Sequence, residues 1–406
     1  MTTNARTSRV ALALLALATG GFAIGTTEFV TMGLLPDVAH GIHRSIASTG
    51  HVISAYAFGV VVGAPVIVSL AARLPKRALL VALVGFVGVG NAVTALAHGY
   101  GWLMAARFVA GLPHGAYFGV ASLVAASLVE PARRGRAVAM VMLGLSVATV
   151  AGVPASTWLG QHLGWRAAYW SVVGVAALTA ALLVAFVPSS PGNPRASLRG
   201  ELSALQRPQV LFAATAGMVG FGGVFAMYSY IAPVVTDVTG LGRHTIPAFL
   251  LAFGLGSVAG TWLAGRLADW DVSRAVVGGF VASIVVLVSF FVLSPHAVPT
   301  FVLVFAIGVL GSVLAINLQL RLMHAAGDAQ MLGAALNHSA LNIANGVGAW
   351  LGSVVISAGL GYRAPSLVGA GLAVAGLGIF AVGIAHARRP VAQAEPVPAY
   401  SSASTS

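Results

Sequence analysis

The chain has 406 residues, of which 58% are hydrophobic and only 7% are charged. Soluble domains carry about 25% charged residues, so this composition cannot cover a chain of this length with a water-facing surface. The 21 Lys and Arg residues against 9 Asp and Glu give a formal net charge of +12, which by itself could indicate nucleic-acid binding. Because the chain has no cysteine, disulfides, thiolate metal sites and cysteine nucleophiles are excluded.

Apolar stretches recur along the chain, and each approaches or exceeds the roughly 17–25 residues that cross a bilayer as a helix. The pattern predicts an all-α membrane protein with twelve transmembrane helices. The first stretch resembles a signal peptide, but it is too long for one and similar stretches follow it. The predicted spans are 10–35, 50–72, 78–97, 102–128, 137–160, 167–187, 210–235, 246–267, 275–293, 300–322, 332–357 and 366–385.

Basic side chains are distributed unevenly over the predicted loops. With a cytoplasmic N-terminus, only Arg44, Arg166, Arg243 and Arg363 fall in external loops, and Arg107 lies within a helix. All other Lys and Arg residues then lie on the cytoplasmic side, as the positive-inside rule requires. We therefore expect a multi-pass protein of the bacterial cytoplasmic (inner) membrane with both termini cytoplasmic. The basic excess is explained without a nucleic-acid partner.

A polar segment divides the chain almost in half. Residues 188–209 form the longest polar interior stretch and predict a cytoplasmic linker. It separates an N-terminal six-helix bundle (1–187) from a C-terminal six-helix bundle (210–387). The remaining residues, 388–406, are rich in Pro, Ala and Ser and predict a disordered cytoplasmic tail.

The two halves share sequence anchors at a common offset of 197 residues. Pro36 matches Pro233, Gly-Trp-Arg166 matches Gly-Tyr-Arg363, and position 72 matches Asp269. Three anchors at one spacing indicate an internal repeat. Two parallel, pseudo-symmetric six-helix repeats define one large class of transporters.

Several motifs in these spans are family-specific. They are Gly25-Thr-Thr-Glu28-Phe29 with Met32-Gly-Leu-Leu-Pro36, Gly63-Ala-Pro65, Arg107, His114-Gly115, Gly152-Val-Pro154-Ala-Ser-Thr-Trp-Leu-Gly160, Gly265-Arg-Leu-Ala-Asp269 and Ile356-Ser-Ala-Gly-Leu-Gly-Tyr-Arg363. With them the chain resembles the major facilitator superfamily, and within it the drug:proton antiporter branch. Within that branch it resembles the arabinose-efflux-permease-like transporters, relatives of sugar and chloramphenicol exporters. The chain departs from the family pattern at Ala72 and Pro75 in the loop between helices two and three, and at Val153 in helix five.

The resemblance implies a secondary transporter that works by alternating access between two bundles. It would export a small organic solute, such as chloramphenicol or a sugar-like compound, as a monomer that needs no cofactor because a proton gradient drives it. The sequence leaves open an uptake symporter or uniporter and, from another class, a non-transporting receptor or scaffold. No P-loop, Gly-x-Ser-x-Gly elbow or His/Glu metal cluster is found, so no enzyme or metal site is expected.

Two ionic side chains fall well inside predicted spans, Glu28 in helix one and Arg107 in helix four. Intramembrane charges are expensive and face a cavity or one another. Burial and a nearby guanidinium act on the pKa of a carboxyl group in opposite directions. A changing distance between the two groups could therefore switch proton binding, and the resemblance supports this role. A static salt bridge is the alternative. His114 lies on the same helical face as Arg107 and could relay protons, or could be a packing residue.

The second half carries a set of uncharged polar and aromatic side chains that could line a substrate site. Buried amides without partners are unfavourable, so a polar cavity would explain them; hydrogen bonding between helices is the alternative. The predicted substrate-binding residues are Tyr228, Tyr230, Asn317, Gln319, Asn337, His338 and Asn342, with Asn345 nearby.

Candidate gating residues lie at a helix bend and in a loop. Pro154 marks a place where helix five can bend, or a site of ordinary close packing among its glycines. Arg266 and Asp269, with Asp271 and Arg274, are expected to form a cytoplasmic gate network, as the family's loop motif does.

Overall fold

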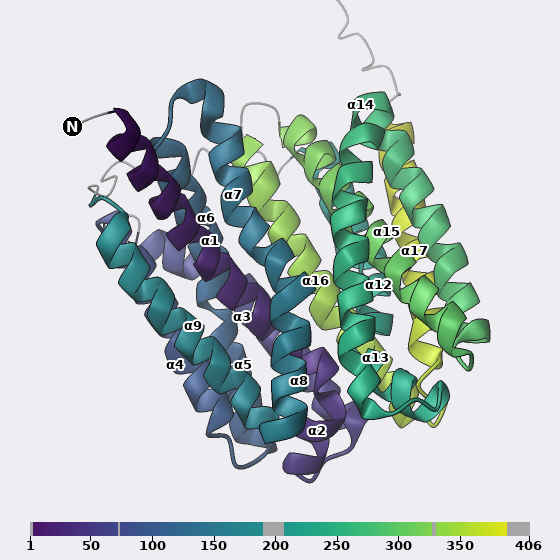
Figure 1. Cartoon of the computed structure of the whole chain (residues 1–406). Coiled ribbons are helices and arrows are strands. Elements are labelled where there is room, and N and C mark those ends of the chain that lie inside the picture. Colours follow the sequence, from purple (N-terminus) through teal and green to yellow (C-terminus); the bar gives the residue numbers. More distant parts are fainter. Residues whose placement is uncertain (1–2, 72–73, 190–206, 327–329, 388–406) are drawn as a thin grey trace, which may run out of the picture.

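The computed structural model describes residues 3–71, 74–189, 207–326 and 330–387. Within these residues the chain forms helices and connecting turns and no strand (Figure 1). The predicted tail lies outside the described residues, and so does most of the predicted linker. The all-α prediction is confirmed.

The N-terminal half makes six crossings from helices that are in part interrupted. The fourth crossing changes helix at Leu112, just before a proline, and the fifth contains a π-helical turn, η2. The elements are α1 (Thr3–Gly33), α2 (Leu35–Gly41), α3 (Ile46–Ala71), α4 (Lys76–Ala95), α5 (Tyr100–Gly111), α6 (Pro113–Ser127), η1 (Pro131–Arg133), α7 (Arg134–Val147), η2 (Ala148–Gly152), α8 (Val153–Leu163) and α9 (Trp165–Phe186).

The C-terminal half begins with a crossing made of short pieces and continues in long helices. Its elements are α11 (Pro208–Gly220), α12 (Gly222–Tyr228), α13 (Ile231–Pro233), η4 (Val234–Val238), η5 (Arg243–Thr245), α14 (Ile246–Leu293), α15 (Ala297–Ala326), α16 (Gln330–Ser357) and α17 (Ala364–Ala387).

The helix α14 contains two of the twelve predicted crossings. Eleven segments of the described chain are long and apolar enough to cross a membrane, and the one containing α14 has 51 residues. At 1.5 Å per residue that segment is far longer than the roughly 30 Å hydrocarbon core. The backbone of Asp271 is extended (φ −169°, ψ 111°), and its Oδ1 accepts a hydrogen bond of 2.9 Å from the Arg274 N–H. Asp271 thus ends one crossing and caps the next.

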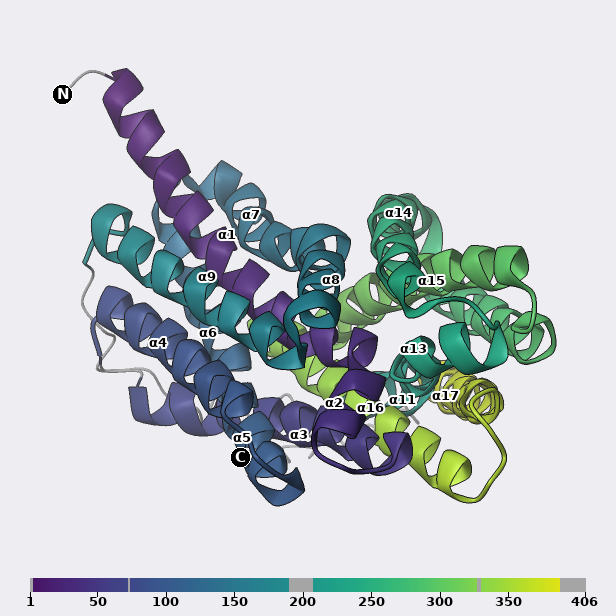
Figure 2. The same ribbon diagram turned by 60° about the horizontal axis from the view of Figure 1, so that its bottom comes forward.

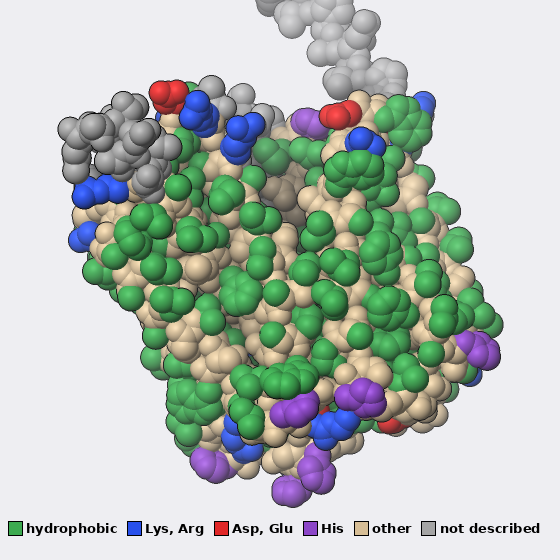
Figure 3. Space-filling model, in the orientation of Figure 1, with side chains coloured by type: hydrophobic (Ala, Val, Ile, Leu, Met, Phe, Trp, Pro, Cys, Tyr) green, Lys and Arg blue, Asp and Glu red, His purple; other side chains and the backbone are tan. Residues whose placement is uncertain are grey.

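The two halves lie side by side as separate bundles (Figures 1 and 2). We call the end that carries the start of α1, the Asp271 break and the end of α17 the terminal face, and the other end, with α2, the opposite face. Hydrophobic and neutral side chains cover the band between them, whereas ionic side chains and histidines gather at the two ends (Figure 3). This is the surface expected of a chain that spans a bilayer.

The bundles meet closely in the half of the molecule toward the opposite face. The Ser54 hydroxyl on α3 donates to the Gly346 carbonyl on α16 at 2.8 Å, and the Ser353 hydroxyl on α16 donates to the Ala47 carbonyl on α3 at 2.9 Å. At the terminal face, by contrast, the surface is hollowed between the bundles (Figure 3). The structure is therefore closed at the opposite face and open at the terminal face.

Candidate functional site

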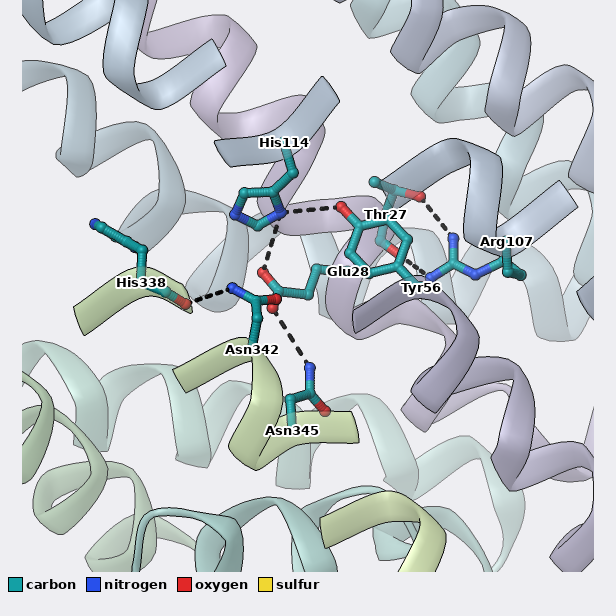
Figure 4. A network of polar contacts seen from close by, with 8 residues as sticks. All are labelled: Thr27, Glu28, Tyr56, Arg107, His114, His338, Asn342 and Asn345. Atoms are coloured by element: carbon teal, nitrogen blue, oxygen red, sulfur yellow. Dashed lines mark hydrogen bonds and ion pairs between the residues drawn. The ribbon is translucent and has the colours of Figure 1, made fainter. Parts of the chain in front are cut away.

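The Glu28 carboxyl lies at the boundary between the two bundles. Its side chain belongs to α1, and the residue is 6% exposed. Its Oε2 lies 4.0 Å from Nδ1 of His114 on α6, and its Oε1 accepts a hydrogen bond of 3.5 Å from Nδ2 of Asn345 on α16 (Figure 4). The carboxyl therefore contacts side chains of both halves and points into the protein rather than toward lipid.

Arg107 is buried beside this carboxyl without forming an ion pair with it. Its Nη1 donates to the Thr27 hydroxyl and its Nη2 to the Thr27 carbonyl, each at 3.0 Å. The guanidinium carbon lies 4.3 Å from the centre of the Tyr56 ring, a cation–π contact. The static Glu28–Arg107 salt bridge considered from the sequence is therefore absent, because the neighbouring Thr27 binds the guanidinium group instead.

The hydrogen bonds of Thr27 continue into the N-terminal bundle. Its hydroxyl donates to Oδ1 of Asn91 at 2.6 Å, and the Asn91 amide in turn donates to the Val87 carbonyl at 2.8 Å. Arg107 is thus held by oxygen acceptors that are themselves fixed. Sequence spacing did not connect Arg107 on α5 with Thr27, Asn91 or Tyr56, because these lie on α1, α4 and α3. Thr27 belongs to the Gly25-Thr-Thr-Glu28 motif, but the motif does not show its contact with Arg107.

His114 connects Glu28 to Tyr56. Its Nδ1 lies 3.1 Å from the Tyr56 hydroxyl as well as 4.0 Å from Glu28, so one nitrogen faces two partners. Unprotonated, Nδ1 can accept a hydrogen bond from the tyrosine; protonated, it can donate to the carboxylate. The structure therefore brings together the three residues predicted for proton handling, with Tyr56 between His114 and Arg107 (Figure 4).

Two of the predicted substrate residues from helix seven lie in different surroundings. Tyr228 stacks on Phe253 with ring centres 3.9 Å apart, and it packs in a T-shaped arrangement with Phe29 with ring centres 6.3 Å apart. Because Phe29 follows Glu28 in α1, Tyr228 belongs to an aromatic cluster beside the carboxyl. Tyr230 instead donates to the Ala349 carbonyl at 2.7 Å and lies in the closed contact between bundles.

The predicted asparagines donate mainly to backbone carbonyls. Asn317 bonds to the Val313 carbonyl at 2.9 Å, Asn337 to the Ala315 carbonyl at 3.2 Å and Asn342 to the His338 carbonyl at 3.0 Å. Asn337 thus joins α16 to α15, as the helix-bonding alternative expects. The Oδ1 atom of each of these three is buried and accepts no hydrogen bond from the described residues.

His338 and Gln319 complete this set. The His338 ring stacks on Phe118 with centres 6.1 Å apart, and Phe118 also lies 5.3 Å from the His114 ring. His338 therefore lies next to the proton-handling group (Figure 4). Gln319 is partly buried on α15, with no recorded hydrogen bond to the described residues.

The predicted gate network at the terminal face is not assembled in this conformation. Arg266 lies over the Trp262 ring at 3.7 Å, and Arg274 pairs only with Asp271 at 3.7 Å. No ion pair of Asp269 is recorded among the described residues. The bundles are separated at this face, so these side chains make only local contacts, and their gating role stays a prediction.

Pro154 lies in the first turn of α8, which begins at Val153 directly after the π-helical turn η2. A Cβ on Gly152 would clash with the Thr26 hydroxyl, so this glycine allows the fifth crossing to approach α1 closely. The wide turn and the proline coincide, as irregularities of this kind do at bends. Pro154 therefore lies beside an irregular turn in an otherwise continuous helix, next to the tightly packed Gly152.

An ion pair that was not predicted joins the bundles at the opposite face. Arg243 Nη2 lies 2.5 Å from Asp37 Oδ1 and 3.2 Å from the Gln161 carbonyl, while the Gln161 amide donates to the Arg243 carbonyl at 2.8 Å. Burial raises the pKa of the Asp37 carboxyl, and the Arg243 charge offsets this only in part. In the sequence, the only indication of this ion pair was that Asp37 directly follows the repeat anchor Pro36.

Among the described residues no group of three or more His, Cys, Asp or Glu side chains could hold a metal ion. The residues of this site offer hydrogen bonds, aromatic surface and a single buried carboxyl. Such a site can bind a solute or a proton.

Comparison with known proteins identifies the family. Residues 17–336 match the model of the Major Facilitator Superfamily. The chain belongs to the major facilitator superfamily. It is 38% identical to the inner membrane transport protein YdhP of Escherichia coli (strain K12), covering 93% of this chain and 96% of that one. It is 36% identical to a chloramphenicol resistance protein of Streptomyces lividans, covering 88% and 91%.

A solved major facilitator structure has the same fold. The bacterial homologue of the human lysosomal transporter Spinster, in an inward-facing and unoccupied conformation, matches with a TM-score of 0.69 at 15% identity, covering 95% of this chain and 96% of that one. This likeness shows the fold. Membership of the superfamily makes the chain a multi-pass membrane transporter and not an enzyme, as the sequence predicted.

Proposed function

We propose that this transporter exports a small organic solute in exchange for protons, with Glu28 as the group that binds and releases the proton. The observation that supports the proposal most is the position of Glu28. It is a buried carboxyl that contacts the N-terminal bundle through His114 and the C-terminal bundle through Asn345. A proton bound there changes the charge at the boundary that must rearrange during alternating access.

The direction and the solute class are supported by relatives. The similar proteins include the chloramphenicol resistance protein of Streptomyces lividans and a probable sugar efflux transporter of Helicobacter acinonychis, which is 28% identical over 84% of this chain. We propose that the solute is a neutral drug-like or sugar-like compound. The aromatic and amide side chains around Tyr228 and Asn342 suit a neutral amphipathic solute, with Pro154, Arg266, Asp269 and Arg274 acting as gating residues.

We propose that the terminal face is cytoplasmic, that the protein works as a monomer and that it lies in the inner membrane. The positive-inside rule favours this orientation, because only four of the basic residues outside α5 lie in predicted external loops: Arg44, Arg166, Arg243 and Arg363. The hollow at the terminal face would then open toward the cytoplasm, where an exporter collects its solute.

The test is transport by the purified chain in proteoliposomes, with radiolabelled chloramphenicol as the first probe. A resistance screen of an overexpressing strain chooses further probes. We expect an imposed pH gradient to drive chloramphenicol against its concentration gradient, and Glu28→Gln to abolish this accumulation. Asp237→Asn is the matched control, because it removes an exposed carboxylate outside the site.

Undiminished proton-driven accumulation by Glu28→Gln would refute the role of Glu28. Solute movement in the same direction as the protons would indicate an uptake symporter, and flux indifferent to the pH gradient would indicate a uniporter. No flux of any probe that the resistance screen selects would favour a non-transporting receptor.

A further inference from the structure

Asn345 makes the direct contact between the C-terminal bundle and the Glu28 carboxyl. The residue is 1% exposed, and its Nδ2 donates to Glu28 Oε1 at 3.5 Å, which is longer than the roughly 2.7–3.2 Å of most N–H···O hydrogen bonds. Its own Oδ1 is also buried and accepts no hydrogen bond from the described residues. The next residue, Gly346, accepts the Ser54 hydroxyl of the other bundle. The amide therefore lies in the closed contact between bundles, with one of its two polar atoms unused (Figure 4).

The chemistry of the two groups makes this contact sensitive to a proton. An ionised carboxyl only accepts hydrogen bonds, whereas a protonated one also donates. The amide N–H of Asn345 therefore suits the carboxylate, and a hydrogen bond to an ionised group is about twice as strong as a neutral one. A proton on Glu28 removes that charge and leaves a weaker neutral contact.

Other titratable or charged side chains surround the carboxyl, and all but one of them come from the N-terminal bundle. They are His114 on α6, Tyr56 on α3 and Arg107 on α5. His338 on α16 lies farther away, beyond the His114 and Phe118 rings. His114, Tyr56 and Arg107 move with α1 when the bundles rock, since they belong to the same bundle. Of the contacts of Glu28 described here, the hydrogen bond from Asn345 is the one that separation of the bundles would break.

We propose that Asn345 is a positioning residue that holds the opposite face closed while Glu28 is ionised and loosens it when Glu28 is protonated. This inference rests on the proposed function. In this inference, the contact of α16 with Glu28 keeps an empty, deprotonated transporter from changing conformation. Such a change would dissipate the solute gradient without proton exchange.

The experiment uses the absence of cysteine in the natural chain. Spin labels on Leu163→Cys and Val298→Cys, both exposed near the opposite face, report the separation of the bundles by distance measurement in lipid nanodiscs without solute. The protein carries Asp37→Asn throughout, so that this external acid does not titrate. The double-mutant cycle compares the unaltered site, Asn345→Ala, Glu28→Gln and the combined variant at alkaline and acidic pH.

We expect Asn345→Ala to raise the ratio of open to closed molecules at alkaline pH by roughly two- to tenfold, because it removes one long hydrogen bond to a charged group. At acidic pH, or in the Glu28→Gln background, the same substitution should change the ratio far less. Ser283→Ala, which removes a buried hydroxyl bonded within its own helix, controls for a general loosening of the C-terminal bundle and should leave the ratio unchanged.

An equal effect of Asn345→Ala with and without the Glu28 charge would make Asn345 a merely structural contact and overturn the inference. That result is distinct from failure of the proposed function, in which Glu28→Gln leaves proton-driven accumulation intact. If accumulation depends on Glu28 but the double-mutant cycle shows no coupling between Glu28 and Asn345, the proposed function stands. Asn345 then does not connect the charge of Glu28 to closure of the opposite face.

Discussion

Arg243 Nη2 lies 2.5 Å from Asp37 Oδ1, and this ion pair joins the two bundles at the face away from the termini. The pair is unsymmetrical. The Arg243 side chain is 56% exposed, whereas that of Asp37 is only 16% exposed. Closure therefore removes the carboxylate from water much more than the guanidinium, and each partner has a different effect when it is removed.

Replacing Arg243 by Gln should open the opposite face. The substitution leaves the Asp37 carboxylate buried without its cation, so the closed state becomes less favourable. Asp37→Asn is the matched comparison and should leave closure intact or strengthen it, because the desolvation of the charge outweighs the attraction of Arg243. Label distances between Leu163→Cys and Val298→Cys measure both. Equal opening by the two variants would contradict this reading of the pair.

The same carboxyl should make closure depend on pH. The pKa of Asp37 is raised in the closed structure, so the closed state binds a proton more tightly than a state in which Asp37 is exposed. Lowering the pH from above that raised pKa to below the ordinary aspartate value should therefore favour closure. The measurement uses the Glu28→Gln background and subtracts the response of the Glu28→Gln, Asp37→Asn variant, so that the remaining change in distance belongs to Asp37 and not to other groups such as His51, which contacts Ser353 across the bundles. A pH-independent distance, or opening on acidification, would be inconsistent with this sign.

Thr27→Val should destabilise the N-terminal bundle. It deprives the buried Arg107 of its hydroxyl acceptor and leaves Asn91 Oδ1 without its donor. Unsatisfied buried groups of this kind cost about 1–3 kcal/mol each, so thermal unfolding in detergent should shift to a lower temperature. Thr300→Val is the control, since its hydroxyl bonds only to the backbone of its own segment, and it should cause a smaller shift.

His114→Gln should change the pH profile of transport without abolishing it. The imidazole connects Glu28 to Tyr56, but the carboxyl that carries the proton in our proposal remains. We expect slower proton-driven chloramphenicol transport with a displaced pH optimum. Initial rates across a pH series in proteoliposomes check this, with Tyr56→Phe as the companion variant that keeps the imidazole. An unchanged profile in His114→Gln would make it a packing residue.

The sequence predicts most of the fold because its signals are local. Twenty-residue apolar runs and basic loops define the crossings, including the two that α14 joins through Asp271. Composition could not reveal that Arg107 binds Thr27 rather than Glu28, because that choice depends on the relative rotation of α1 and α5. The ion pair between Asp37 and Arg243 could not be predicted either, because it joins residues of different halves across the closed face.

The gate residues show a different limit of sequence reasoning. Arg266 and Asp269 were identified by a loop motif, yet in this conformation Arg266 lies over Trp262. A network between the bundles would require the side chains of the two halves to meet at that face, and this conformation holds them apart. The loop motif therefore predicts gating residues at the terminal face, whereas this structure shows only the closed contact at the opposite face.

Gly254→Ala should weaken closure of the opposite face by steric contact alone. Gly254 on α14 faces the fifth crossing of the other bundle, and a Cβ there would lie 2.5 Å from the Thr149 carbonyl oxygen. Each bundle can fold with this methyl group, but the two cannot approach as closely as they do here. We therefore expect a larger open fraction in the Leu163→Cys, Val298→Cys distance measurement. Gly278→Ala on the same helix is the control, because nothing lies within 4 Å of its added Cβ. If both variants keep the closed distance, the contact at Gly254 does not limit how the bundles meet.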